Sequence, residues 1–297
     1  MSKIDDTFAE AFDGIFTRVI VTAKDRKRMQ KAAYGSTALP SVVIGRVEGG
    51  VERFLKQYET PDGRVGAILQ FWGAYNQSHA KQSVDLFYRE LSYRIRQGIL
   101  VVPTTALYNS LETGEKLDLM SGVGHCGDGY ESEEDYLGRR MIRIPLMMGD
   151  FLIERYIGRG FGIAGGNIWL FCKDEDAALK AGEKAIKAIS KVHGVITPFD
   201  ICSAGSKPET KFPEIGPTTN HYYCPSLRKK IADSKVPENV NSIPEIVING
   251  ISLDAVKKAM GAAIHAVKNM PEVIKISAGN YGGKLGNHRI YLRDLST

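Results

Sequence analysis

Residues 276–286, near the C-terminus, combine four glycines with an amide, a phenol and a lysine, directly after the apolar stretch 273–276. Glycine lets the backbone approach a ligand closely and adopt positive φ, and lysine supplies a point positive charge. Such a segment can hold a carboxylate, a phosphate or a flat ring, although the same composition suits a tight surface turn. The candidate ligand-binding residues in it are Asn280, Tyr281, Gly282, Gly283 and Lys284.

A Gly-Asp-Gly segment is the second candidate, because glycines on both sides expose the Asp128 carboxylate without crowding. Turn chemistry alone could also explain this composition. The acidic run 133–135 that follows resembles the solvated charge of an exposed hairpin. The candidate site residues here are Gly127, Asp128, Gly129, Tyr130 and Glu131.

Two further segments carry groups that could face a ligand. Residues 160–167 contain Gly-x-Gly-x-x-Gly, but no strand precedes it and no helix follows, so a backbone-lined ligand wall or a bulged strand entry fits better than a dinucleotide site. Residues 203–207 offer a hydroxyl and a cation to an anionic group, or form a plain loop. The candidates from both segments are Gly165, Gly166, Asn167, Ser206 and Lys207.

Glu245 begins the otherwise apolar stretch 245–248. If it is partly buried there, its pKa rises towards a value useful for acid–base chemistry. The pattern alone favours the simpler alternative, a strand-end carboxylate that faces water.

Composition narrows the class of protein. The chain has 297 residues, 43% of them hydrophobic, and can bury the core of one large domain or of two domains of about 150 residues. Its longest apolar runs, such as Ile99–Pro103 and Ile168–Cys172, are strand-sized, so no membrane-spanning helix is expected. The first residues, Met1–Asp6, lack an apolar signal segment, which predicts a cytoplasmic protein.

Metal and nucleic-acid sites are not predicted. The four cysteines and six histidines show no ligand spacing, and Cys172 is expected to be a buried small hydrophobic residue. The net charge of +5 is modest and favours small anionic ligands. The basic runs Lys24–Arg28 and Arg228–Lys230 resemble solvated helix faces, so no nucleic-acid partner is expected.

Hydrophobic periodicity predicts helices that each carry one apolar stripe and one polar face. These helices are expected at Asp25–Tyr34, Ala80–Arg96, Asp174–Val192 and Ser252–Lys268, the last with Ser252 as N-cap. Each lies between two strand-like runs. The paired runs are Arg18–Ala23 with Ser41–Arg46, Val65–Gly73 with Gly98–Pro103, Gly166–Cys172 with Val195–Phe199, and Glu245–Gly250 with Val273–Ala278.

This order, β-α-β-β-α-β in each half, is that of the split βαβ or ferredoxin-like sandwich. We therefore predict an α+β protein with two duplicated ferredoxin-like lobes, residues 1–145 and 146–297, and a ligand site in the cleft between them. A doubly wound nucleotide-binding sheet is the weaker alternative, because no Gly-x-Gly-x-x-Gly lies between the first strand and the first helix and no Walker A motif occurs.

Six sequence blocks in fixed order carry a family resemblance that spans essentially the whole chain. They are Asp6–Phe12, Glu59–Arg64, Pro103–Ala106, Gly127–Glu131, Gly162–Asn167 and Ala278–Gly286. Together they resemble the formylmethanofuran–tetrahydromethanopterin formyltransferase family. The resemblance implies formyl transfer between methanofuran and N5 of tetrahydromethanopterin as co-substrates, with no metal and no tightly bound cofactor. It also implies a homotetramer or homodimer, or a subunit of a bacterial formyltransferase/hydrolase complex.

Glu245 matches the family's strand-borne catalytic carboxylate, so the resemblance implies that it is the general acid/base. Loops around Asp128 and Asn280 are then expected to clamp the coenzymes, and Lys207 and Lys284 to bind their anionic tails. Residues 242–244 and 122–126 depart from the family's usual sequence. A non-catalytic coenzyme-binding or scaffold subunit is the alternative function.

Overall fold

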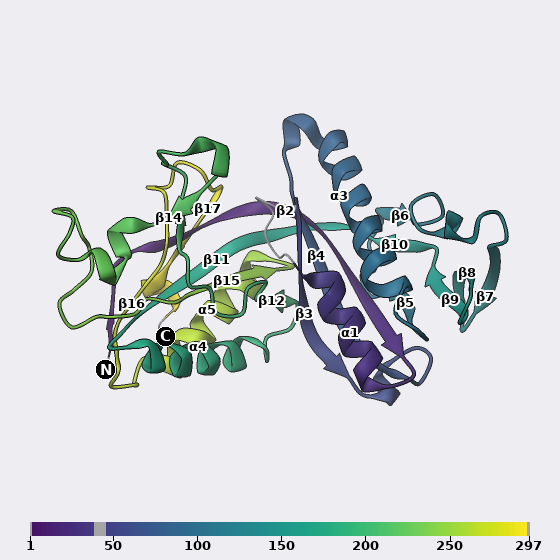
Figure 1. The fold of residues 1–297 in the computed structure, drawn as a ribbon, viewed down its shortest axis with the longest axis horizontal. Coiled ribbons are helices and arrows are strands. Elements are labelled where there is room, and N and C mark those ends of the chain that lie inside the picture. The colour runs from purple at the N-terminus through teal and green to yellow at the C-terminus, as the bar shows by residue number, and fades with distance from the viewer. Residues whose placement is uncertain (1, 39–45, 296–297) are drawn as a thin grey trace. The chain divides into compact units, whose positions relative to one another are not determined.

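The computed structural model describes residues 2–38 and 46–295. The chain divides into two compact units: unit 1 comprises Met1–Asp13 and Ile163–Thr297, and unit 2 comprises Gly14–Gly162. Each unit is α+β, with helices packed on a sheet and a hydrophobic core of its own (Figure 1). In the described part of the chain, no helix is long and apolar enough to cross a membrane.

The sheet of unit 2 places its strands in the order β3–β4–β2–β5, with antiparallel neighbours. A parallel contact then joins β5 to β9, and β8 and β7 follow. β6 and β10 form a separate antiparallel pair. The bounds are β2 (Phe8–Ala23), β3 (Val47–Leu55), β4 (Val65–Ala74), β5 (Ala106–Asn109), β6 (Lys116–Asp118), β7 (Ser132–Tyr136), β8 (Arg139–Leu146), β9 (Gly149–Glu154) and β10 (Tyr156–Gly158).

The described residues of unit 2 include the helices α1 (Arg26–Thr37) and α3 (Ala80–Arg94). Asp25 caps α1, since its carboxylate accepts a hydrogen bond from the backbone N–H of Arg28 at 2.9 Å. The predicted apolar stripe of this helix is confirmed: Met29, Ala32 and Ala33 are buried.

The strand predicted at Gly98–Pro103 is wrong. Residues Ile95–Leu100 extend α3 as a π-helical turn instead. Ile95 and Ile99 are fully buried, so the apolar run continues the buried side of the helix. Gly98 permits this, because a Cβ there would lie 2.5 Å from the Cα of Ser36 on α1. The strand predicted at 41–46 lies, apart from Arg46, outside the described residues, and β3 follows it.

In unit 1 the strand order is β16–β11–β15–β12, again with antiparallel neighbours. β1 adds in parallel to β16, and β17 pairs with the N-terminal part of β2. Helices α4 and α5 lie side by side and bury their apolar faces against these strands (Figure 1). The bounds are β1 (Lys3–Ile4), β11 (Gly160–Cys172), α4 (Glu175–Ile189), β12 (Val195–Ile196), β13 (Ser206–Lys207), β14 (Thr218–Thr219), β15 (Glu245–Gly250), α5 (Leu253–Val267), β16 (Val273–Ser277) and β17 (His288–Tyr291).

Most predicted elements of unit 1 are confirmed, with altered bounds. Ser252 caps α5 through a 3.1 Å hydrogen bond from Ala255 N–H. β11 begins six residues before the predicted Gly166, so the glycine-rich segment enters the sheet. A bulge between Ile163 and Gly166 accommodates it, which confirms the bulged strand entry. β12 ends at Ile196, short of the predicted Phe199.

Candidate active site

Glu245 begins β15 and lies opposite Trp169 of β11. Its backbone exchanges two 2.8 Å hydrogen bonds with Cys202 on the other side, so its position is set from both directions. The Trp169 indole N–H donates to the Glu245 carboxylate at 2.9 Å. Burial raises the pKa of Glu245, although the Trp169 hydrogen bond acts in the opposite direction. The structure therefore has the partly buried carboxyl that the sequence offered as a hypothesis.

The Tyr281 phenol lies within the electrostatic influence of this carboxyl and close to Ser206. Burial raises the pKa of the Tyr281 phenol, the negative charge of Glu245 raises it further, and a hydrogen bond with Ser206 opposes both. Trp169 forms one wall: its ring stands edge-on to Tyr223 at 4.7 Å, and a Cβ on Gly279 would come within 2.7 Å of the indole. Tyr281 is thus influenced by two residues of unit 1 that were predicted from other segments, Glu245 and Ser206.

The glycine-rich segment 279–286 folds around an internal anion, the carboxylate of Glu10. One oxygen of Glu10 accepts hydrogen bonds from the N–H groups of Tyr281 at 2.7 Å and Gly283 at 2.8 Å. Its other oxygen accepts from Leu285 and Gly286, each at 2.6 Å. The backbone donors expected to bind a ligand's carboxylate or phosphate are therefore already occupied by the protein itself.

Asn167 and Asn280 anchor the start of this loop. The Asn167 side chain accepts from Gly279 N–H at 2.6 Å and donates to Gly279 O at 3.1 Å. The Asn280 amide donates to Phe8 O at 3.1 Å and accepts from Gly282 N–H at 3.1 Å. Both amides, predicted to bind ligand, hold backbone in place.

The remaining candidates in unit 1 have different surroundings. Gly165 has φ of +84° at the β11 bulge and donates to the Asn249 side chain at 2.9 Å. Gly166 lies under α5, where a Cβ would come within 2.3 Å of Val256. The Lys207 ammonium donates to the backbone carbonyl of Glu209, and Lys284 is exposed.

The Gly127–Glu131 loop belongs to unit 2 and follows a 3-10 turn at Gly124–Gly127. Asp128 is exposed at φ of +54° and Gly129 has φ of +87°. Glu131 closes the turn: one oxygen lies 2.7 Å from the His125 ring, and the other accepts from Gly129 N–H at 2.9 Å. The hydrogen bond with His125 holds the pKa of Glu131 below its usual range.

Comparison with protein families decides the classification. A family model described as formylmethanofuran–tetrahydromethanopterin formyltransferase matches residues 1–146, and a model of that family's proximal lobe matches residues 149–295. The chain belongs to this family.

Members of the formyltransferase family match the chain along almost its whole length. A formylmethanofuran–tetrahydromethanopterin formyltransferase-like protein of Archaeoglobus fulgidus is 59% identical over 98% of this chain and 96% of that protein. The solved formyltransferase of Methanosarcina barkeri is 39% identical, with a TM-score of 0.90 over 99% of this chain and 98% of that one. The solved formyltransferase/hydrolase complex of Methylorubrum extorquens with methylofuran gives 35% identity and a TM-score of 0.89 over 98% and 96%.

Two of the family blocks have a structural role in unit 2. Asp62 accepts hydrogen bonds from Arg64 at 2.7 Å, Thr22 at 2.8 Å and Tyr108 at 3.0 Å. Arg64 in turn donates to the backbone carbonyl of Thr104, which joins the block 59–64 to the block 103–106. Burial opposes ionisation of Asp62, but these hydrogen bonds and the Arg64 charge together lower its pKa.

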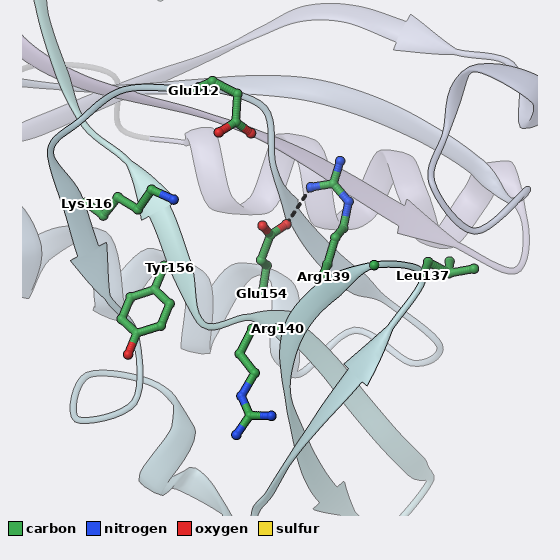
Figure 2. Close-up of a pocket in the computed structure, with 8 residues that line it drawn as sticks. Glu112, Lys116, Leu137, Arg139, Arg140, Glu154 and Tyr156 are labelled. Carbon is green, nitrogen blue, oxygen red and sulfur yellow. Dashed lines mark hydrogen bonds and ion pairs between the residues drawn. The ribbon is translucent and has the colours of Figure 1, made fainter.

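A polar surface pocket of about 440 Å³ also lies in unit 2, and none of the candidate residues lines it (Figure 2). Arg139 and Glu154 form an ion pair of 2.6 Å inside it. The Asn109 backbone N–H also donates to Glu154 at 2.8 Å, so these charges are already compensated. The pocket therefore does not compete with the Glu245 site as the candidate active site of this formyltransferase-family chain.

Two further expectations concern the burial of Cys172 and the binding of metal ions. Cys172 is buried in β11, as predicted, and burial raises the pKa of its thiol to about 12. Within residues 2–38 and 46–295, no three His, Cys, Asp or Glu side chains gather in a way that could hold a metal ion.

Sequence reasoning assigned no role to Trp169 or Glu10. Trp169 sits in a run of five apolar residues, Ile168–Cys172, where an indole is expected to be core. Glu10 shares one face of its strand with Phe8 and Phe12, and these apolar neighbours two residues away are the sequence signal that its carboxylate faces into the fold.

Proposed function

We propose that this chain transfers a formyl group between formylmethanofuran and N5 of tetrahydromethanopterin. Family membership supports the reaction class. The observation that carries the assignment to a site is Glu245, a carboxyl whose pKa is raised by burial, which accepts a hydrogen bond from Trp169 and whose charge influences the Tyr281 phenol. A carboxyl whose pKa is raised by burial holds its proton more readily than a free carboxyl and can act as a general acid.

The proposed mechanism is acyl transfer between two amines through a tetrahedral intermediate. N5 of the acceptor forms a C–N bond to the formyl carbon and loses its proton, while the C–N bond to the methanofuran amine breaks and that amine gains a proton. Protonated Glu245 donates to the formyl oxygen or to the leaving amine, and the Tyr281 hydroxyl is a second donor for the developing oxyanion. Both coenzymes act as co-substrates, with no metal and no tightly bound cofactor.

The remaining site residues are proposed from the family resemblance. Asp128 is proposed as a second catalytic group and its neighbours 127–131 as a coenzyme clamp, supported by the exposure of Asp128. Residues 165–167, 206–207 and 280–284 are proposed to line the coenzyme site. The proximity of Tyr281 to both Ser206 and Glu245 supports this wall.

We also propose two ferredoxin-like lobes, residues 1–145 and 146–297. The family models, which divide between residues 146 and 149, support the boundary. The order of elements along the chain supports the duplication. Both units run strand, helix, strand, strand, helix, strand. A homodimer or homotetramer is proposed, and the solved formyltransferase/hydrolase complex supports assembly with other subunits as the bacterial alternative.

Replacing Glu245 with glutamine tests the proposed function. Glutamine keeps the shape and the Trp169 hydrogen bond but cannot transfer a proton, so kcat should fall by about 10²–10⁴-fold. Formyl transfer to tetrahydromethanopterin is followed by absorbance with purified protein. Glu183→Gln, which removes an exposed carboxylate from α4, is the matched control and should retain the full rate. An unchanged rate in Glu245→Gln would refute the assignment.

A second candidate function rests on the names of the relatives. The protein of Archaeoglobus fulgidus at 59% identity is named formyltransferase-like, whereas the solved formyltransferase of Methanosarcina barkeri is 39% identical. In this alternative, the chain belongs to a branch that binds the coenzymes as a scaffold without catalysis. Coenzyme binding measured by calorimetry, with no turnover by the wild-type protein, would support the scaffold over the enzyme.

A further inference from the structure

Glu10 is an unusual carboxylate because it is almost wholly buried, at 2% exposure, and accepts hydrogen bonds from four backbone N–H groups. The donors come from one loop, residues 281–286. Burial alone would raise the pKa of Glu10, but these hydrogen bonds outweigh it and lower the pKa. The carboxylate is therefore ionised at neutral pH and acts as an internal anion around which the loop folds.

The loop has few apolar contacts to hold it in this shape. Tyr281 is half-buried, Gly282 and Lys284 are exposed, and Leu285 is 52% exposed. Gly282 and Gly283 adopt φ of +69° and +70°, a conformation that aligns successive N–H groups but costs backbone entropy. Hydrogen bonds to a charged acceptor are the main interaction available to offset that cost.

Tyr281 connects this anion to the candidate active site. Its backbone N–H donates to Glu10 at 2.7 Å, while its phenol lies within the electrostatic influence of Glu245 and hydrogen-bonds Ser206. Arg289 supports the same arrangement from the far side, since its guanidinium donates to Gly283 O at 3.0 Å. The backbone of Tyr281 is thus held by Glu10, and its phenol is influenced by the charge of Glu245.

We propose that Glu10 is a positioning residue whose buried carboxylate holds the 281–286 loop closed and so keeps the Tyr281 hydroxyl beside Glu245. The effect on catalysis rests on the proposed formyl transfer, but the effect on the loop does not. Glu10 touches no reacting atom in this role and acts through Tyr281.

Glu10→Gln tests this role. The glutamine side chain lacks the negative charge of Glu10, and its NH₂ group would face two of the loop's N–H donors. Backbone hydrogen exchange at Tyr281, Gly283, Leu285 and Gly286 should become about tenfold to a hundredfold faster. The pKa of Tyr281, followed by NMR of ¹³C-labelled tyrosine, should move down towards its ordinary value, because the phenol becomes less buried and the Glu10 charge that also raises its pKa is lost. If the chain is a formyltransferase, kcat should fall by about 10–100-fold through misplacement of Tyr281.

Asp13→Asn is the matched control. Asp13 also lies on β2 and also holds the C-terminal segment, but through the side chains of Asn287 and His288, each at 2.7 Å. Its loss should leave exchange in 281–286 and the pKa of Tyr281 unchanged. Equal effects of the two variants, or unchanged exchange and Tyr281 pKa in Glu10→Gln, would overturn the proposal.

A wild-type measurement covers the case in which Glu10→Gln does not fold. As pH falls, protonation of Glu10 should shift the amide proton resonances of Tyr281, Gly283, Leu285 and Gly286 together; independent or absent shifts would overturn the proposal. A wild-type protein without transferase activity would refute the proposed function and leave the exchange, NMR and titration results as the test of Glu10.

Discussion

The acidity of Glu245 depends on one neighbouring side chain as well as on burial. Burial favours the neutral acid, whereas the Trp169 indole N–H favours the carboxylate. The two residues oppose each other in the register of β15 and β11, so their 2.9 Å contact is part of the sheet geometry. A change at Trp169 should therefore alter the proton affinity of Glu245 without removing the acid.

Trp169→Phe should raise the pKa of Glu245 further, because it removes the hydrogen bond that stabilises the charged form. If Glu245 acts as the general acid, the rate falls as pH rises through this pKa, so the high-pH limb of the kcat profile should move to higher pH. The maximal rate should fall by less than about tenfold, since the acid is retained. Trp72→Phe is the control, because it removes an indole N–H that donates to Gln70 in unit 2. It should leave the high-pH limb of the kcat profile unchanged. A shift to lower pH in Trp169→Phe would contradict the account.

The elements of unit 1 position the site through close contact between sheet and helix. α5 packs on β11 where Gly166 presents no side chain, and the bulge beside it turns Gly165 towards Asn249. β11 then continues to Trp169, whose indole meets Gly279 at the start of the loop. The glycines in this strand therefore serve packing as well as chain direction.

Gly166→Ala should destabilise the protein by about 1–3 kcal/mol, because its Cβ would lie 2.3 Å from Val256 Cγ1 and 3.3 Å from Ile248 O. Denaturant unfolding measures the loss as a lower midpoint. Gly114→Ala is the control, since a Cβ there meets nothing within 4 Å, and its midpoint should stay unchanged. Equal midpoints for the two variants would show that α5 can yield at no cost.

The molecule as a whole places buried, hydrogen-bonded carboxylates in both units. Glu10 orders a loop in unit 1, and Asp62 joins two segments in unit 2. The pKa of each is held below its ordinary value by hydrogen bonds that outweigh burial. The folded protein binds protons at these two carboxylates less readily than the unfolded chain does. Both groups therefore stabilise the folded protein at pH values above their unfolded-state pKa values, about 4.3 for Glu and 3.9 for Asp.

Stability should therefore be level near neutral pH and fall as pH drops below about 4.5 and through the lowered pKa values of the two groups. The loss should be of the order of 1–3 kcal/mol for each carboxylate. Urea unfolding midpoints from pH 3 to pH 8 measure it. In Glu10→Gln and Asp62→Asn the midpoint near pH 7 should be lower and the acid-dependent fall smaller. A fall as steep as that of the wild type in both variants would contradict the assignment.

The sequence by itself determined the helices, most strands and the family, because these follow from local periodicity, caps and ordered motifs. It failed at Ile95–Leu100, where a buried glycine contact with α1 lets an apolar run continue as helix. Glu245 was identified as a candidate, but the indole N–H that donates to its carboxylate belongs to Trp169, 76 residues away. The hydrogen bonds of the Glu10 carboxylate join residues at least 271 positions apart, so no local pattern could pair them. Only the tertiary structure decided that the glycine-rich loop near the C-terminus encloses a carboxylate of the protein itself, because only folding brings that loop to β2.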